Sequence, residues 1–144
     1  MPILGYNIVS IDADRTMKTP SISNIDVSST AKISSVEDRT ITFPEKLEAL
    51  GIGFEFNTQY KPDLANIKLI GEVVFVDKDH KNILKFWNKN KKLPDEIDLE
   101  IKNFLFRRCL TLGVNLSQEL QLPPPVVFPV FTKKEKDEDT KYIG

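Results

Sequence analysis

The chain has 144 residues, 40% of them hydrophobic, nine Phe and a formal net charge of -1, which indicates one domain with enough apolar material for a core. Because acidic and basic side chains nearly balance, no overall field draws the chain onto nucleic acid or an anionic membrane. The single cysteine, Cys109, excludes an intrachain disulfide, and with the single histidine, His80, it leaves too few ligands for a closed zinc site. Since no apolar run approaches a membrane span and no basic head with an apolar run begins the chain, we expect a cytoplasmic protein without metal, cofactor or membrane insertion.

Two strands are expected in the first forty residues. Leu4, Tyr6 and Ile8 recur at period two, which predicts a strand over 3–12. A second strand is predicted within 22–36, where β-branched residues recur around a Ser-Ser-Thr group (28–30) that could equally form a bend.

The segment 50–77 gives the clearest strand pattern. One face of the strand predicted at 50–60 carries Ile52, Phe54, Phe56, Thr58 and Tyr60, and the opposite face is polar. Pro62 and Asp63 supply turn chemistry, and the following strand, predicted at 66–77, is apolar on both sides near its end. This second strand should therefore be central or lie against a second chain, and the two strands should form an antiparallel hairpin.

Helical spacing replaces the strand pattern after Asp77. A short lysine-rich helix is predicted at 79–90, and a long helix at 95–121 begins with Pro94 and a group of acidic residues. One apolar stripe of the long helix contains Ile97, Ile101, Leu105, Cys109, Leu112, Leu116 and Leu120, and a second contains Phe106, Leu110 and Val114. A four-stranded sheet covers one stripe, so we expect the second to lie in an interface between copies of the chain. The competing explanation is that the second stripe packs within one chain against the proline-rich segment 122–131.

The end of the chain cannot continue the helix. Three successive prolines in LPPPVVFPVF (122–131) fix φ and remove donors, which predicts an extended, proline-rich arm. Residues 132–144 are highly charged, and we expect a disordered tail there. The chain is thus predicted to be a single α+β domain over 1–131, with an antiparallel four-stranded sheet, a long C-terminal helix packed on it and the arm.

No group of residues predicts catalysis. The acidic pair Asp12 and Asp14, like the acidic residues at 95–98 and 137–139, is typical of solvated charge rather than of a catalytic acid in a dry pocket. Cys109 lies in mid-helix on the apolar stripe, where a buried structural thiol is expected. We therefore expect no enzymatic activity.

The lysine-rich run 78–92 has two interpretations. Six lysines surround Phe86 and Trp87, a mixture used for stacking on single-stranded nucleic acid. A small amphipathic helix, docked through Ile83, Leu84 and Trp87 with its lysines in water, is the favoured interpretation.

The C-terminal half of the chain resembles the SecB-like protein-export chaperones. The resemblance rests on NFLF (103–106) at the start of the helix and on LPPPVVFPV (122–130) after it. In addition, GFEFNTQY (53–60) and GEVVFV (71–76) stand where that family has its last two strands. A pattern of residue types over roughly 50–131 carries the likeness. It implies a four-stranded antiparallel sheet under a long helix, assembly into dimers or tetramers, and apolar grooves that hold non-native polypeptide.

These observations favour a non-enzymatic binder of unfolded or extended polypeptide. The candidate peptide-binding residues are Ile52, Phe54, Phe56, Tyr60, Leu122, Val126 and Phe128, and the same side chains can equally be core. The candidate residues for an interface between copies are Phe106, Leu110 and Val114. Two alternatives stay open: a nucleic-acid-binding module that uses 78–92, and a structural subunit of a larger assembly.

Overall fold

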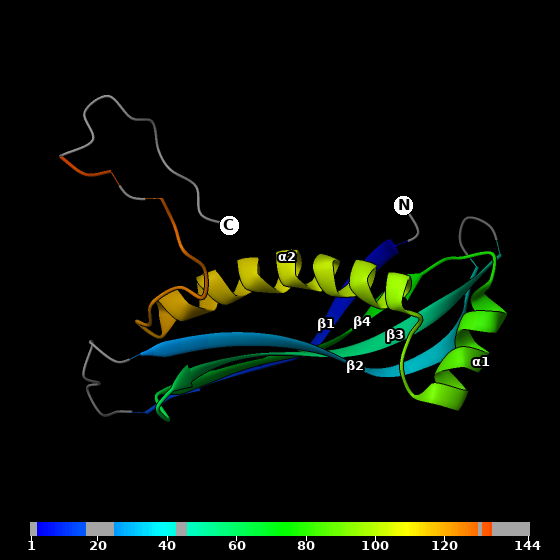
Figure 1. The fold of residues 1–144 in the computed structure, drawn as a ribbon, viewed down its shortest axis with the longest axis horizontal. Coiled ribbons are helices and arrows are strands. Elements are labelled where there is room, and N and C mark those ends of the chain that lie inside the picture. The colour runs from blue at the N-terminus through cyan, green and yellow to red at the C-terminus, as the bar shows by residue number, and fades with distance from the viewer. Residues whose placement is uncertain (1–2, 17–24, 43–45, 130, 134–144) are drawn as a thin grey trace.

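A computed structural model describes residues 3–16, 25–42, 46–129 and 131–133. The described elements are β1 (Ile3–Arg15), β2 (Asp26–Ile41), β3 (Leu47–Lys61), β4 (Ala65–Phe75), α1 (His80–Asn90) and α2 (Asp95–Glu119). The strands form one antiparallel sheet in the order β1-β4-β3-β2. Figure 1 shows α2 along one face of this sheet and α1 at the end of the sheet where α2 begins. The predicted α+β fold with a four-stranded antiparallel sheet and a long C-terminal helix is confirmed.

The hairpin predicted at 50–77 is the centre of the sheet. β3 and β4 pair from Tyr60 opposite Ala65 to Leu50 opposite Phe75. β4 also pairs with β1 along its whole length, and β3 pairs with β2. β4 is therefore a central strand, as its apolar residues on both sides predict.

The bounds of all six elements differ by one to five residues from the predicted ones, and β2 differs most. β2 ends at Ile41 rather than at 36, because it pairs with β3 from Asp26 opposite Lys61 to Ile41 opposite Leu47, interrupted only by a bulge. The pairing along this long ladder outweighs the tendency of the serines and the threonine at 28–30 to form a bend. Residues 22–24 of the predicted strand lie outside the described residues. α2 ends at Glu119 rather than at 121.

The core lies between α2 and one face of the sheet. Phe54 and Phe56 from β3 meet Ile101, Leu105 and Cys109 from α2, and all five side chains are at most 1% exposed. The opposite face of the sheet is polar and carries ion pairs, such as Arg39–Glu72 at 2.9 Å. The predicted first stripe of the long helix is therefore the one that packs on the sheet.

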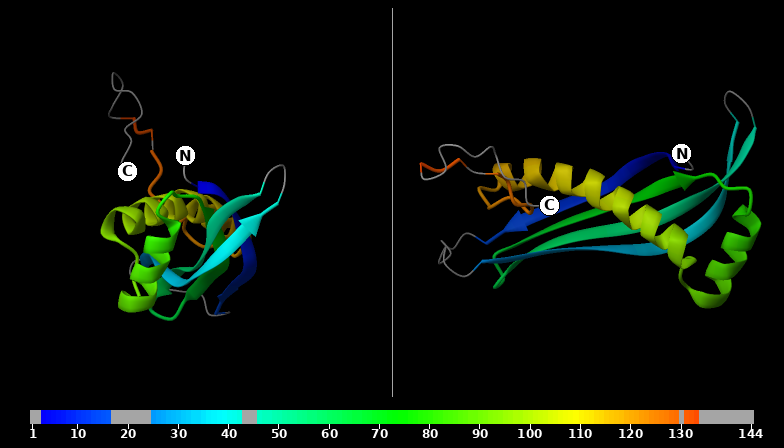
Figure 2. Two further views of the ribbon diagram at one scale, coloured as in Figure 1. Left: turned by 90° about the vertical axis from the view of Figure 1, so that its right-hand side faces the viewer. Right: turned by 45° about the horizontal axis from the view of Figure 1, so that its top comes forward.

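The C-terminal end of α2 is fastened to β1. α2 crosses the strands obliquely (Figure 2), so that this end of the helix lies beside β1. Nη1 of Arg15, the last residue of β1, donates a 2.7 Å hydrogen bond to the carbonyl oxygen of Leu120. A cation at this position also complements the negative end of the helix dipole.

The arm follows α2 without helix or strand over 122–129. Its first residues are held to the body of the protein by the Leu122 amide, which donates to Ser117 O at 2.8 Å, and by the Tyr60 hydroxyl, which donates to Pro123 O at 2.6 Å. Residues 134–144 of the predicted tail lie outside the described residues.

Candidate functional site: a groove between α2 and the arm

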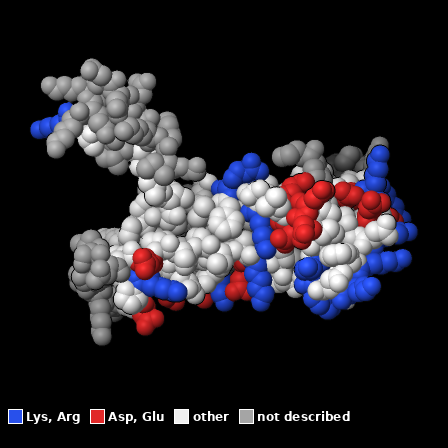
Figure 3. Space-filling view, viewed as in Figure 1, with Lys and Arg blue, Asp and Glu red and all other residues white. Residues whose placement is uncertain are grey.

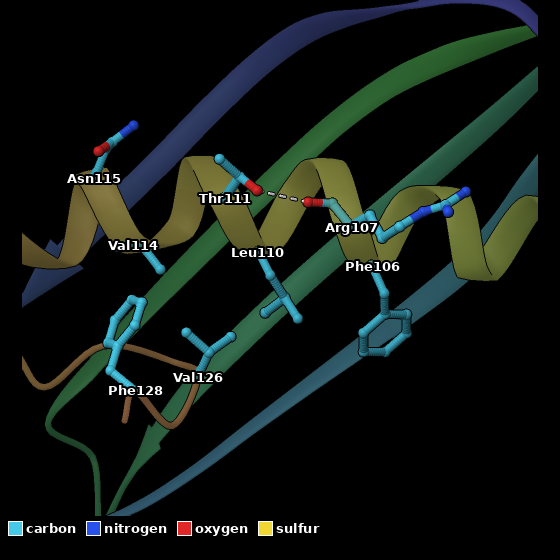
Figure 4. Close-up of a pocket in the computed structure, with 8 residues that line it drawn as sticks. All are labelled: Phe106, Arg107, Leu110, Thr111, Val114, Asn115, Val126 and Phe128. Carbon is cyan, nitrogen blue, oxygen red and sulfur yellow. Dashed lines mark hydrogen bonds between the residues drawn. The ribbon is translucent and has the colours of Figure 1, made fainter. Parts of the chain in front are cut away.

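An apolar groove of about 460 Å³ opens between the outer side of α2 and the arm (Figure 4). It is lined by Phe106, Arg107, Leu110, Thr111, Val114, Asn115, Val126 and Phe128. Its size is within the range of small-ligand pockets. Five of its eight lining side chains are apolar, so the groove suits an apolar ligand.

Helical spacing places one wall of the groove. Phe106, Leu110 and Val114 recur every four residues, so they share one side of α2, and Figure 4 shows Leu110 and Val114 directed toward the arm. The Phe106 ring also packs edge-to-face on Phe56 of β3, with 5.1 Å between ring centroids. This wall is therefore continuous with the core and is held in place by it.

The arm supplies the opposite wall through Val126 and Phe128. The arm approaches the helix at Gly113, where an added Cβ would be in ordinary contact with Cγ of Pro125 at 3.5 Å. A larger side chain at 113 would push the arm away from α2. A glycine in mid-helix costs about 1 kcal/mol relative to alanine. This unfavourable residue is the sequence signal that could have indicated the close approach of the arm.

Polar side chains of α2 border the groove. Figure 4 shows Arg107, Thr111 and Asn115 on the side of the helix away from the arm. The Thr111 hydroxyl donates to the Arg107 carbonyl oxygen at 2.7 Å, whereas the Arg107 guanidinium and the Asn115 amide carry N–H groups that can donate to a ligand. Such donors can bind backbone carbonyl oxygens of a polypeptide along the edge of the groove.

Charge is concentrated away from the groove. In Figure 3 the surface over the C-terminal half of α2 is largely uncharged, and acidic and basic side chains gather toward the end of the molecule that contains α1. The acidic ones include Asp95, Glu96 and Asp98 in the first turn of α2. An apolar, uncharged ligand could therefore bind in the groove without displacing the water that hydrates these charged side chains.

The structure divides the predicted peptide-binding residues into two sets. Val126 and Phe128 line the groove, together with all three predicted interface residues. By contrast, Ile52, Phe54, Phe56 and Tyr60 are at most 1% exposed and Leu122 is 7% exposed. Because α2 covers this face of β3, its side chains form core, which was the other interpretation of the pattern, and they are not part of the groove.

Further observations concern the reactivity of Cys109, metal binding and membrane-spanning helices. Burial raises the pKa of the Cys109 thiol to about 12, so the thiolate that a nucleophile requires is disfavoured. Within the described part of the chain, no three His, Cys, Asp or Glu side chains are placed to hold a metal ion together. Among the same residues, no helix has the length and apolar character needed to cross a membrane.

Comparison with known proteins identifies a shared fold. No family model matches the chain, and no curated protein matches it in sequence. Among solved structures, the chain is similar to a SecB-like chaperone of Mycobacterium tuberculosis in complex with a ChAD peptide from the HigA1 antitoxin, with a TM-score of 0.53 and 11% identity. The match covers 91% of this chain and 90% of that one. The sheet, the long helix and their order thus form a fold that this chain shares with a SecB-like chaperone.

Proposed function

We propose that this protein binds extended, non-native polypeptide segments in the groove between α2 and the arm, as a chaperone of the SecB-like type. The observation that carries the proposal is the groove itself, a partly exposed apolar channel with hydrogen-bond donors along its edge. A polypeptide binder of this kind needs no catalytic group. It needs apolar contact for affinity, and it needs polar groups that form hydrogen bonds with the peptide backbone, which clients of many sequences share.

The dimensions of the groove fit a short stretch of extended chain. Phe106 and Val114 are eight residues apart on α2, which is about 12 Å along the helix axis at 1.5 Å per residue. An extended peptide rises about 3.3 Å per residue, so roughly four of its residues lie along this wall. The shared fold supports the proposal independently, because the similar chaperone from Mycobacterium tuberculosis was solved with a peptide.

Suppression of aggregation tests this function. A chemically unfolded protein is diluted into buffer with an equimolar amount of the chain, and light scattering is followed. We expect the wild type to delay aggregation and Leu110→Gln to lose most of the delay. Leu99→Gln is the matched control, because Leu99 lies on α2, is 63% exposed and does not line the groove. No delay by the wild type, or an equal delay by both variants, contradicts the proposal.

One observation favours a second candidate function, the binding of single-stranded nucleic acid by α1. Lys81, Lys85 and Lys89 recur at four-residue spacing on α1 and are exposed, and the exposed Lys78 and Lys92 lie just beyond its two ends. Ile83 is buried and Trp87 packs on the core, so the docked amphipathic helix accounts for the apolar residues of this run. Phosphate contacts would then come from the lysines alone.

Salt dependence separates the two candidate functions. Binding to phosphates weakens steeply as salt rises, whereas apolar binding does not. We expect Lys85→Glu with Lys89→Glu to abolish binding to a labelled single-stranded RNA if α1 binds it, and to leave the suppression of aggregation unchanged. RNA binding that survives this double charge reversal contradicts the α1 proposal.

A further inference from the structure

Two side chains of the arm lie against the apolar side of α2 that carries Phe106, Leu110 and Val114. Val126 and Phe128 line the groove, whereas Val127 between them is 64% exposed. The chain bends at Pro125 and Val126, and Val126 and Phe128 both reach the groove while the residue between them does not. Figure 4 shows Val126 and Phe128 facing the side chains of Leu110 and Val114.

The polar attachments of the arm end before this segment. Tyr60 bonds to Pro123 O, and Leu122 bonds to Ser117 O. Between described residues, the structure gives no hydrogen bond or ion pair that joins 124–129 to another part of the protein. The contact of residues 126–128 with the helix is therefore apolar, and it can break without leaving a buried polar group unpaired.

We propose that residues 126–128 partly cover the apolar side of α2 that forms one wall of the groove, and that a client segment displaces them when it binds. The groove then selects extended segments that carry large apolar side chains at alternate positions, as the arm does. This inference rests on the proposed function of the groove, and it adds the class of client and a competition that controls access.

The arm is well placed to compete. Pro123, Pro124 and Pro125 fix φ and keep the following residues close to α2, so their effective concentration at the groove is high. A groove that is empty only part of the time binds a client with an affinity reduced by that fraction. The alternative is that Val126 and Phe128 form a permanent wall, in which case their removal weakens binding.

Fluorescence anisotropy with a labelled synthetic peptide distinguishes these alternatives. The peptide carries Val and Phe at alternate positions, separated by Ser, and is titrated with the full chain. We expect the double variant Val126→Ser, Phe128→Ser to bind it about ten-fold more tightly than the wild type, if the arm occupies the groove about nine-tenths of the time. Val127→Ser is the matched control and is expected to bind like the wild type, because Val127 does not line the groove.

Equal or weaker binding by the double variant overturns the inference. A second peptide of the same composition, with its apolar residues contiguous, tests the class of client. We expect it to bind several-fold more weakly than the alternating peptide, and equal affinity overturns the proposed selectivity. If neither peptide binds to any variant and aggregation is not delayed, the proposed function itself fails. Circular dichroism and thermal melting confirm that each variant is folded.

Discussion

The hydroxyl of Tyr60 donates a 2.6 Å hydrogen bond to the carbonyl oxygen of Pro123. This bond joins β3, in the centre of the sheet, to the start of the arm. Tyr60 is 1% exposed, so its position is fixed by the core. Tyr60 therefore fixes the place where the arm leaves the core, and hence the width of the groove, although Tyr60 does not itself line the groove.

Replacing Tyr60 by Phe is expected to destabilise the fold by about 0.5–1.5 kcal/mol, the usual net value of one hydrogen bond. Urea denaturation followed by circular dichroism measures this change. Tyr6→Phe is the control, because it preserves the edge-to-face contact of Tyr6 with Phe104 and should cost less. Equal losses in the two variants would mean that the Tyr60–Pro123 bond contributes nothing specific.

Alkaline pH should weaken the fold through buried groups that are neutral in the native state. Burial raises the pKa of Tyr60, and burial raises the pKa of Cys109 to about 12. Because both folded pKa values lie above the unfolded ones, this stability is fully present below the unfolded pKa and is lost as pH rises through the folded pKa. We expect the free energy of unfolding to fall from about pH 9 upward.

Urea midpoints measured at several pH values test this dependence. The fall in the free energy of unfolding should be shallower in Tyr60→Phe than in the wild type, because the variant lacks one of the groups that ionise on unfolding. If the free energy of unfolding falls with pH at the same slope in both proteins, Tyr60 does not contribute to this pH dependence.

Two glycines are expected to respond in opposite ways to alanine. At Gly71 a Cβ would collide with the carbonyl oxygen of Asn7 on β1 and press on the Phe54 ring, so Gly71→Ala should destabilise by about 2 kcal/mol or more. At Gly113 the nearest atom belongs to Pro125 at an ordinary contact distance, so Gly113→Ala should stabilise α2 by up to about 1 kcal/mol. Thermal melting of both variants checks the two signs, and a loss at Gly113 would show that the arm packs more tightly than described.

Much of the fold could be predicted from local pattern. The alternation of residues 52–60 correctly gave β3 and its apolar face, and the acidic start after Pro94 gave the first turn of α2. The pairing of β1 with β4 could not be predicted in this way, because it joins residues that are 50 (Arg15 and Ala65) to 72 (Ile3 and Phe75) positions apart in the sequence. Likewise, pairing with β3 sets the length of β2, although residues 28–30 have only a weak local preference for a strand.

The site was only partly predictable, for a related reason. Alternation shows that Phe54 and Phe56 share a face, but it cannot show whether a helix covers that face. α2 covers it with Leu105 and Cys109, so these aromatic side chains became core. The second stripe of α2 was recognised from four-residue spacing, with an interface between copies or the arm as its two predicted covers. Only the three-dimensional path of the arm shows that Val126 and Phe128 lie against it.

Self-association through the same stripe remains a prediction. Phe106, Leu110 and Val114 are partly exposed in the single chain, and burying such side chains between copies would contribute about 1.5–3 kcal/mol for each fully buried one. Sedimentation at tens of micromolar protein should show a dimer or tetramer, which Leu110→Asp dissociates into folded monomers and Leu99→Asp does not. A wild-type monomer at that concentration would contradict the predicted interface.

The most direct test of the central claim is site-specific photo-crosslinking to an unfolded polypeptide. A photoreactive residue is placed at Asn115, on the edge of the groove, or at Leu99, which is exposed on the same helix outside the groove. If the groove holds extended polypeptide, the probe at 115 forms crosslinks with the unfolded client and the probe at 99 forms few. Equal crosslinking from the two positions, or none from position 115, would contradict the account.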